Sequence, residues 1–384
     1  MNIILFHDSE HLSLLPLSFM RPVGELRIGI LTFKERWERW AQHPVSHSAE
    51  SYLQERFSGV VEDENLYIRA TILPDSSLRE QILKLTQGSA LMHEETLIAF
   101  HGTQEDFEKR NFNSEVQWKE DFVWLQRPYD FFLHNAQAIE MDYALVTSGR
   151  KSAEISSTNG VVGENVFVEE GAYVEYSVLN SDKGYIYIGK NAKVLEGCLI
   201  RGSLALCDNA TLNMGSKIYG ATTIGNHCKV GGEVNNSVLM QYSNKGHEGF
   251  LGNSVLGEWC NLGADTNNSN LKNNYGEVKL YHYGTGKFEK TGLQFCGLMM
   301  GDHAKSAINT QFNTGTVVGP FANVFHSGFP PNKIEAFSWG GNRGAEKFKL
   351  DAALEMAEKM MQRRGIDLQD SDRSIIQHLY NMKS

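Results

Sequence analysis

Residues 186–230 read IYIGKNAKVLEGCLIRGSLALCDNATLNMGSKIYGATTIGNHCKV. Within this stretch an aliphatic residue recurs at every sixth position, namely Ile188, Val194, Ile200, Leu206, Leu212, Ile218, Ile224 and Val230. A period of six is neither the 3.6-residue period of a helix nor the alternation of a single strand. It predicts short parallel strands that turn a corner every six residues and stack their aliphatic side chains inside a solenoid.

The same spacing extends well beyond the quoted stretch. It is present at Val162 and returns as far along the chain as Val324. Three sides make one triangular coil, and glycine or asparagine suits the corners because both adopt positive φ at little steric cost. We therefore expect a parallel β-helix over residues 151–340.

The six-residue period is interrupted three times. These interruptions predict segments that leave the coil at residues 180–184, 243–250 and 277–292. Loops that leave a rigid scaffold are where binding and chemistry concentrate.

Overall composition restricts the class of protein. A chain of 384 residues predicts two or three domains, and a net charge of −10 argues against a nucleic-acid partner. The apolar run at the N-terminus is too short for a signal peptide, and no run is long enough to cross a membrane, so we expect a cytoplasmic protein. Five cysteines without a CxxC pair suggest neither a disulfide framework nor a zinc site.

Two further segments flank the predicted β-helix. Residues 1–150 begin with the buried-strand candidate NIILF and predict an α/β domain. Residues 341–384 carry apolar residues at helical spacing and predict C-terminal helices. A helical cap or trimer arm and a surface helix packed only on its own subunit are both open interpretations.

The segment SNKGHEGF, residues 243–250, contains the strongest catalytic candidate. His247 has glycine at the preceding position and again two positions later, so a substrate can approach its imidazole. Imidazole suits removal of a proton from an amine or hydroxyl near neutral pH. The alternative is a loop histidine that only makes hydrogen bonds. The asparagines downstream, in NLGADTNNSNLKNNYG (261–276), are either polar contacts for a ligand or turn formers.

These segments resemble a known family. SNKGHEGFLGNSVLGEWCNLGADT (243–266) is similar to the acetyltransferase half of the bacterial bifunctional N-acetylglucosamine-1-phosphate uridyltransferase/glucosamine-1-phosphate acetyltransferases. A closer resemblance is to the Bacteroidetes-type family of such proteins. It is carried by NLGADTNNSNLKNNY (261–275), GLQFCGLMMGDHAKSAINTQFNTGTVVG (292–319) and FSWGG (337–341). The resemblance implies that the β-helix is left-handed, that the protein is a homotrimer and that acetyl-CoA is the acyl donor.

The resemblance also implies roles for single residues. His247 matches the general base that deprotonates the glucosamine amine, Asn261 a contact to the amino sugar, and Asn270 an asparagine near the acetyl group. Ala264 matches the backbone N–H that holds the thioester carbonyl. Phe250 stands where the family has a sugar-contacting tyrosine, so that hydroxyl is missing.

Two departures from the family pattern affect the acetyl-transfer site. Ile308 stands at the position of a serine near the thioester, and Ser306 lies two residues before it. The lysines that bind the sugar phosphate have no match upstream, so Lys245, Lys272 or Lys279 would have to replace them.

The segment HLSLLPLSFMRPVGEL, residues 11–26, resembles the signature of sugar-1-phosphate nucleotidyltransferases. The chain has no glycine before Gly24, so the glycine-rich loop that cradles a triphosphate is missing, and we expect a reduced version of the domain. Arg21 and Arg27 are candidates for binding phosphate or nucleotide, or else structural ion-pair formers. Asp8 is a candidate ligand for Mg²⁺, which this domain would need only if nucleotidyl transfer is retained.

Three functions follow from these observations. The first is an acyl-CoA-dependent N-acetyltransferase that acts on an amino sugar or sugar phosphate. The second is a sugar-1-phosphate nucleotidyltransferase in residues 1–150, with the β-helix as a scaffold. The third is a protein that binds sugar nucleotides without catalysis.

Overall fold

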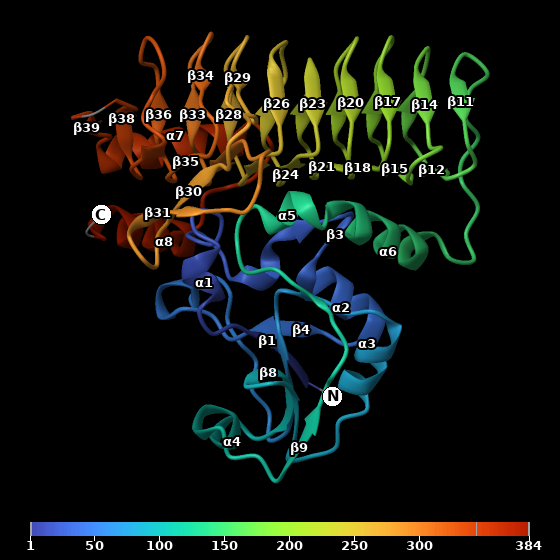
Figure 1. Ribbon diagram of the computed structural model, residues 1–384, viewed down its shortest axis with the longest axis vertical. Helices are drawn as coiled ribbons and strands as arrows, with labels where there is room; N and C mark the ends of the chain where they lie inside the picture. Colours follow the sequence, from blue (N-terminus) through green and yellow to red (C-terminus); the bar gives the residue numbers. More distant parts are fainter. Residues whose placement is uncertain (1, 343, 383–384) are drawn as a thin grey trace.

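A computed structural model describes residues 2–342 and 344–382 of the chain. An N-terminal α/β domain lies against one side of a long parallel β-solenoid, and two C-terminal helices pack beside the solenoid (Figure 1). The predicted fold class is thus confirmed. None of the helices in the described ranges is long and apolar enough to span a bilayer.

The N-terminal domain is built on a mixed six-stranded sheet. Strands β4, β1 and β5 are parallel, β8 runs antiparallel to β5 and β7, and β9 is parallel to β7. In spatial order the strands are β4 (Val45–His47), β1 (Asn2–Phe6), β5 (Asn65–Arg69), β8 (Thr96–Gly102), β7 (Ser89–His93) and β9 (Ser114–Gln117). Two small pairs accompany it, β2 (Arg27–Ile28) with β3 (Leu31–Thr32) and β6 (Ile72–Leu73) with β10 (Val123–Trp124).

Short helices cover this sheet and connect it to the solenoid. They are α1 (Glu10–Ser13), η1 (Val23–Glu25), α2 (Phe33–Ala41), η2 (Ser51–Leu53), α3 (Ser76–Leu83), α4 (Gln104–Lys109), α5 (Asp130–Leu133) and α6 (Asn135–Thr147). Helix α2 starts directly after its N-cap Thr32 because a capping box forms there, in which the Thr32 and Glu35 side chains satisfy each other's backbone N–H groups. Helix α6 leads into the first coil of the solenoid.

The solenoid has three parallel sheets, one for each side of the triangular coil. The outer sheet contains β11 (Gly160–Val162), β14 (Val178–Asn180), β17 (Leu199–Arg201), β20 (Lys217–Tyr219), β23 (Glu233–Asn235) and β26 (Phe250–Gly252). The inner sheet, which faces the N-terminal domain, contains β12 (Val166–Val168), β15 (Ile186–Ile188), β18 (Leu204–Leu206), β21 (Thr222–Ile224), β24 (Val238–Leu239), β27 (Val255–Leu256), β32 (Leu298–Met300), β35 (Thr316–Val318) and β37 (Lys333–Ile334).

The third side is called the cavity sheet here. Its parallel strands are β13 (Tyr173–Val174), β16 (Lys193–Val194), β19 (Thr211–Leu212), β22 (Lys229–Val230), β25 (Asn244–Lys245), β28 (Asn261–Leu262), β33 (Lys305–Ser306), β36 (Asn323–Val324) and β38 (Ser338–Gly340). Strand β39 (Glu346–Lys347) closes it antiparallel to β38. In the later coils, β29 (Asn267–Asn268) pairs with β34 (Gln311–Phe312).

The interior of the solenoid confirms the six-residue prediction. All eight aliphatic residues of the quoted stretch are buried in one continuous core. In this part of the chain Lys193 pairs with Thr211, eighteen positions on, which is one full coil. Asn191 and Asn209 occupy corners with φ of 54° and 58°, the left-handed conformation expected for these positions.

One of the three predicted excursions is wrong, and another is only an enlarged corner. Residues 180–184 lie in a corner between the outer and inner sheets that is three residues longer than the next one, since Val178 pairs with Leu199 after 21 positions but Ile186 pairs with Leu204 after 18. Residues 243–250 do not leave the solenoid but form a corner next to a shortened coil, in which Lys229 pairs with Asn244 after fifteen positions. A shortened coil shifts the sequence period in the same way as an insertion does. The third interruption is a true excursion, and it contains the hairpin of β30 (Lys279–His282) and β31 (Lys287–Lys290).

An aromatic ladder follows the corner between the inner and cavity sheets. Its rings are stacked nearly parallel, with neighbouring centroids 4.1–6.0 Å apart, and belong to His227, Tyr242, Trp259, His303, Phe321 and Phe337. All six residues have φ between 55° and 62°. This conformation is strained for residues other than glycine, asparagine and aspartate, and ring stacking in consecutive coils offsets part of that cost.

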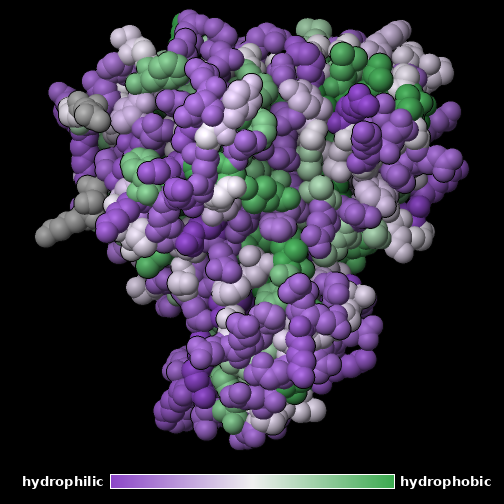
Figure 2. Space-filling model, viewed as in Figure 1, coloured by the Kyte–Doolittle hydropathy of each residue, from purple (hydrophilic) through white to green (hydrophobic). Residues whose placement is uncertain are grey.

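The N-terminal domain and the solenoid share a hydrophobic core. Val238, Val255 and Met299 of the inner sheet belong to the same buried cluster as Leu5 and Leu17. Hydrophobic residues gather where the two parts meet, on a surface that is otherwise mostly hydrophilic (Figure 2). The inner sheet is therefore buried on both faces along this contact.

The C-terminal helices confirm the helical prediction for the end of the chain. Helix α7 (Leu350–Gln362) and helix α8 (Asp370–Asn381) pack on the aromatic ladder through Ala353, Ala357 and Ile376. Both helices thus bury an apolar face on their own chain. Whether they also contact a second subunit stays a prediction.

Candidate active site

A cavity of about 660 Å³ lies between the cavity sheet and helix α7. His247 and Asn261, two of the residues predicted from the sequence, both contribute to its lining. Tyr242 and Trp259 of the aromatic ladder line it as well.

The cavity is strongly cationic. Its lining includes five basic side chains, Lys229, Lys305, Lys359, Arg363 and Arg364, and among the described lining residues there is no carboxylate. Three of the five come from α7 and the turn that follows it, where the C-terminal end of a helix favours positive charge. The Arg364 guanidinium also donates to the Asn244 side chain at 3.3 Å, which holds this turn against β25. Such a lining suits a ligand with several negative charges.

The corner that carries His247 is fixed by hydrogen bonds to its backbone. Lys245 Nζ donates to the carbonyls of Gly231, at 2.9 Å, and of His247, at 2.6 Å. Asn213 Nδ2 donates to the Gly246 carbonyl at 2.7 Å. The His247 side chain itself is exposed at the edge of the cavity. Lys245 therefore lies under the corner rather than in the cavity, and burial lowers its pKa to about 8.

Lys305 is a cavity-lining lysine whose pKa is shifted by its surroundings. It lies on β33 and donates from Nζ to the His303 carbonyl at 3.0 Å. Burial lowers the pKa of Lys305 to about 8, and within the described residues no carboxylate compensates for the loss of water.

Three further predicted residues lie at or beside the corner of His247, in later coils. Ala264 follows β28, and the backbone of Ile308 passes next to Gly263, while 68% of the Ile308 surface is exposed. Ser306 is buried, and its hydroxyl is 2.9 Å from that of Thr266.

The remaining predicted residues of the solenoid lie elsewhere. Phe250 is on the outer sheet, and Asn270 contacts Asn253 at 2.8 Å, at the opposite end of β26 from His247. Lys272 donates to the Glu277 carbonyl at 2.5 Å, at the start of the hairpin excursion.

The three candidate ligand-binding residues of the N-terminal domain all form ion pairs with other side chains of the same chain. Arg21 forms ion pairs with Glu258 and, at 2.7 Å, with Asp302, both of which belong to the solenoid. Arg27 binds Glu35 and the Ile30 carbonyl. These contacts favour the structural interpretation of both arginines.

Asp8 is likewise engaged. Its two carboxylate oxygens accept from Arg69, at 2.6 Å, and from Arg110, at 2.7 Å. A carboxylate that neutralises two guanidinium groups is a poor ligand for Mg²⁺.

Sequence reasoning missed the basic side of the cavity. Lys359, Arg363 and Arg364 come from the segment KMMQRRG (359–365), which reads as the polar end of an amphipathic helix. The clustering of three cations at the end of a helix was the available signal. The fold of the helix back onto β25 and β28 could not be inferred from the repeat.

Comparisons with known proteins identify relatives of this chain. Residues 3–151 match the family described as sugar nucleotidyl transferase. Over 194 residues the chain is 27% identical to the bifunctional sugar-1-phosphate nucleotidylyltransferase/acetyltransferase of Sulfurisphaera tokodaii, which covers 50% of this chain and 47% of the relative. The chain thus spans about half the length of that relative. The resemblance inferred from the sequence is therefore confirmed, since the N-terminal domain matches the sugar nucleotidyl transferase family and the chain is similar to a bifunctional sugar-1-phosphate nucleotidylyltransferase/acetyltransferase.

Proposed function

We propose that this chain is an acyl-CoA-dependent N-acetyltransferase that acts on an amino sugar phosphate in the cavity beside α7. The observation that supports this most is the combination of His247 with five basic side chains around one space. Acetyl-CoA carries three phosphate groups and the acceptor carries one, so cationic side chains favour both ligands. The similarity to a nucleotidylyltransferase/acetyltransferase points to the same substrate class.

The proposed reaction needs one base and no metal ligand from the solenoid. The His247 imidazole accepts a proton from the amine of the acceptor while the amine nitrogen attacks the thioester carbonyl. The tetrahedral intermediate then collapses, so that the C–N bond is kept, the C–S bond breaks and CoA leaves as the thiol after taking a proton. Asn261 contacts the sugar, and the backbone N–H of Ala264 stabilises the carbonyl oxygen.

The homotrimer implied by the family resemblance belongs to this proposal, and exposed apolar residues of the outer sheet such as Val178 and Leu199 would be buried in it.

The assay that tests this function measures CoA release with the full chain, acetyl-CoA and glucosamine-1-phosphate. We expect turnover that depends on the amino sugar. If CoA binds but is not released with any amino sugar phosphate, the chain is a binding protein rather than an acetyltransferase.

Replacing Arg363 and Arg364 together with alanine should raise the KM for acetyl-CoA at least tenfold. Each guanidinium can form a charge-assisted hydrogen bond to a phosphate, worth about 1.5–3 kcal/mol. Steady-state kinetics with varied acetyl-CoA measures this change. Lys349→Ala is the matched control, because Lys349 is exposed just before α7 and does not line the cavity. An unchanged KM in the double variant would remove α7 from the donor site.

Binding of CoA should weaken as the pH rises through about 8. Lys305 has a pKa lowered to about 8, so its ammonium group attracts phosphate below that pH and loses its charge above it. Phosphate groups are already ionised in this range, so their charge does not change. Titration calorimetry between about pH 7 and 9 measures the effect. In Lys305→Arg the charge persists and the affinity should stay flat, whereas a parallel decline in both proteins would exclude Lys305 as the cause.

Nucleotidyl transfer by the N-terminal domain is the second candidate. The match of residues 3–151 to the sugar nucleotidyl transferase family supports it. The absence of a glycine before Gly24 in the sequence and the pairing of Asp8 with two arginines argue for a weakened activity. Mg²⁺-dependent release of pyrophosphate from a nucleoside triphosphate and a sugar-1-phosphate distinguishes this function from acetyl transfer.

A further inference from the structure

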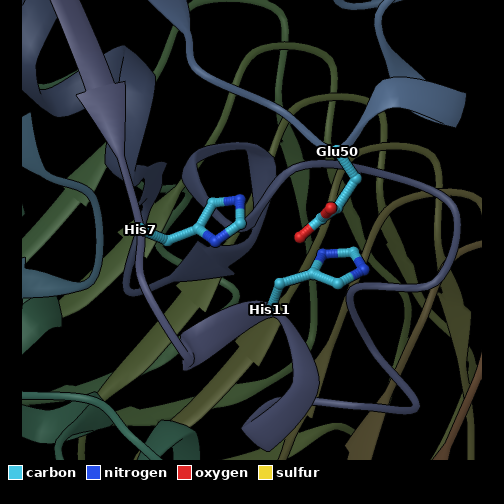
Figure 3. A group of neighbouring side chains, drawn as sticks. All are labelled: His7, His11 and Glu50. Carbon is cyan, nitrogen blue, oxygen red and sulfur yellow. The ribbon is translucent and has the colours of Figure 1, made fainter. Parts of the chain in front are cut away.

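Three potential metal ligands meet at the carboxyl ends of two parallel strands in the N-terminal domain. His7 directly follows β1, His11 belongs to α1, and Glu50 lies three residues beyond β4. One ligand atom of each lies within 4.8 Å of those of the other two. The two imidazoles and the carboxylate face a common space (Figure 3). The crevice at the carboxyl ends of parallel strands is where open α/β sheets bind ligands.

Hydrogen bonds outside the cluster determine which nitrogen of His11 is free. The Tyr52 hydroxyl donates to the Phe19 carbonyl at 2.8 Å, so it can only accept from His11 Nε2, which is 3.1 Å away. The proton of the neutral ring therefore sits on Nε2, and Nδ1 keeps its lone pair. His11 is 95% buried, and its Nδ1 has no hydrogen-bond partner among the residues described.

His7 shows the same arrangement. Its Nδ1 lies 3.3 Å from the Asp8 carbonyl, which can only accept, so this nitrogen carries the proton. Its Nε2 is buried and has no partner within the described part of the chain. Both histidines thus hold a proton on the nitrogen that binds a fixed acceptor and leave the other nitrogen as a lone pair.

The potential metal-ligating atoms of the three residues do not hydrogen-bond to one another. No hydrogen bond joins Glu50 to His7 or His11 in the described residues, although their ligand atoms lie within 4.8 Å. Two unprotonated nitrogens and a carboxylate that converge in a partly buried space repel one another unless a cation lies between them.

We propose that His7, His11 and Glu50 bind a divalent first-row transition-metal ion of the Zn²⁺ type. Two neutral imidazoles and one carboxylate suit Zn²⁺, whereas Mg²⁺ prefers oxygen ligands alone. Zn²⁺ binds nitrogen at about 2.0–2.1 Å, so small side-chain rotations bring the three ligands into contact with it. Because His7 and Glu50 are only half-buried, a fourth position stays open to water or to an oxygen atom of a substrate. This site is distinct from the cavity beside α7 and does not depend on the proposed acetyl transfer.

Tyr52 is the positioning residue of this site. Its hydroxyl accepts a hydrogen bond from His11 Nε2, and its ring stacks on His378 of α8 with centroids 4.4 Å apart. Such outer partners orient the ligand and typically contribute 10–100-fold to metal affinity. The C-terminal helix thus supports a site at the opposite end of the chain.

Titration calorimetry of the metal-free full chain with Zn²⁺ tests the proposal. We expect one site per chain, with Kd raised at least tenfold in His7→Ala and in Glu50→Gln, and by about 10–100-fold in Tyr52→Phe. His43→Ala and Glu55→Gln are the matched controls, since both residues are exposed and lie outside the cluster. Mg²⁺ should not compete for the site.

Two outcomes would overturn the metal site. One is the absence of a Zn²⁺ site in the wild type, and the other is an affinity that stays the same in His7→Ala and Glu50→Gln as in the controls. Circular dichroism of the metal-free variants verifies that they are folded. Because His7 and Glu50 are only half-buried, their substitution should leave the core intact. As a second measurement, Co²⁺ bound to the wild type should give the visible absorption bands of a tetrahedral site, and Glu50→Gln should lose them.

Discussion

The variant His247→Ala is expected to lose a factor of about 10²–10⁴ in kcat for acetyl transfer to an amino sugar phosphate, the range that a positioned general base contributes. The loss should fall on kcat rather than on the KM for acetyl-CoA, because in the proposed site the donor phosphates would contact the basic side chains of α7 and β33 instead. Initial rates of CoA release at saturating acetyl-CoA measure it. The corner is held through backbone carbonyls, so alanine leaves its hydrogen bonds intact.

The control for this variant is His326→Ala. His326 is an exposed histidine near the far end of the solenoid and does not line the cavity. The His326→Ala variant should retain wild-type rates of CoA release. A loss of only a few-fold in His247→Ala would show that another group, or water, removes the proton.

The variant Arg21→Met should lower the free energy of unfolding by about 3–5 kcal/mol, the usual cost of removing one partner from a buried ion pair. Arg21 is the shared partner of Glu258 and Asp302, and all three side chains are almost fully buried between the N-terminal domain and the solenoid. Without the guanidinium, two carboxylates are left in a site from which water is excluded. Urea unfolding followed by circular dichroism measures the change.

Two further variants separate charge from packing at this contact. Arg39→Met replaces an exposed arginine of α2 and should change stability by no more than about 0.5 kcal/mol. The triple variant with Arg21→Met, Glu258→Gln and Asp302→Asn removes all three charges and should recover part of the lost stability. If the triple variant is as unstable as Arg21→Met, the ion pairs are not what stabilises this contact.

The regular part of the fold was predictable from the sequence because it depends on local spacing. Each aliphatic residue, from Ile188 to Val230, needs only its neighbours in adjacent coils, so the period alone predicts its burial. The period could not distinguish a shortened coil from an inserted loop, since both shift the phase. For that reason residues 243–250 were predicted to leave the coil although they form one of its corners.

The candidate sites were predictable only in part, because they combine residues that are distant in the sequence. His247 and Asn261 share a cavity in consecutive coils, where the repeat itself brings them together. Arg364 and Glu50 reach their neighbours through the folding of α7 onto β25 and the pairing of β4 with β1. Side-chain tautomers such as that of His11 depend on single hydrogen bonds, and no sequence pattern encodes them.

The shared core between the N-terminal domain and the inner sheet also constrains how the molecule can move. Because apolar side chains of both parts pack in one buried cluster and Arg21 joins them by ion pairs, we expect the N-terminal domain and the solenoid to move as one body. The proposed metal site near β1 and the cationic cavity near α7 would therefore keep a constant separation. If both sites are active, a product formed at one would have to diffuse through solvent to reach the other, so coupling between the two activities would be set by release and recapture rather than by domain motion.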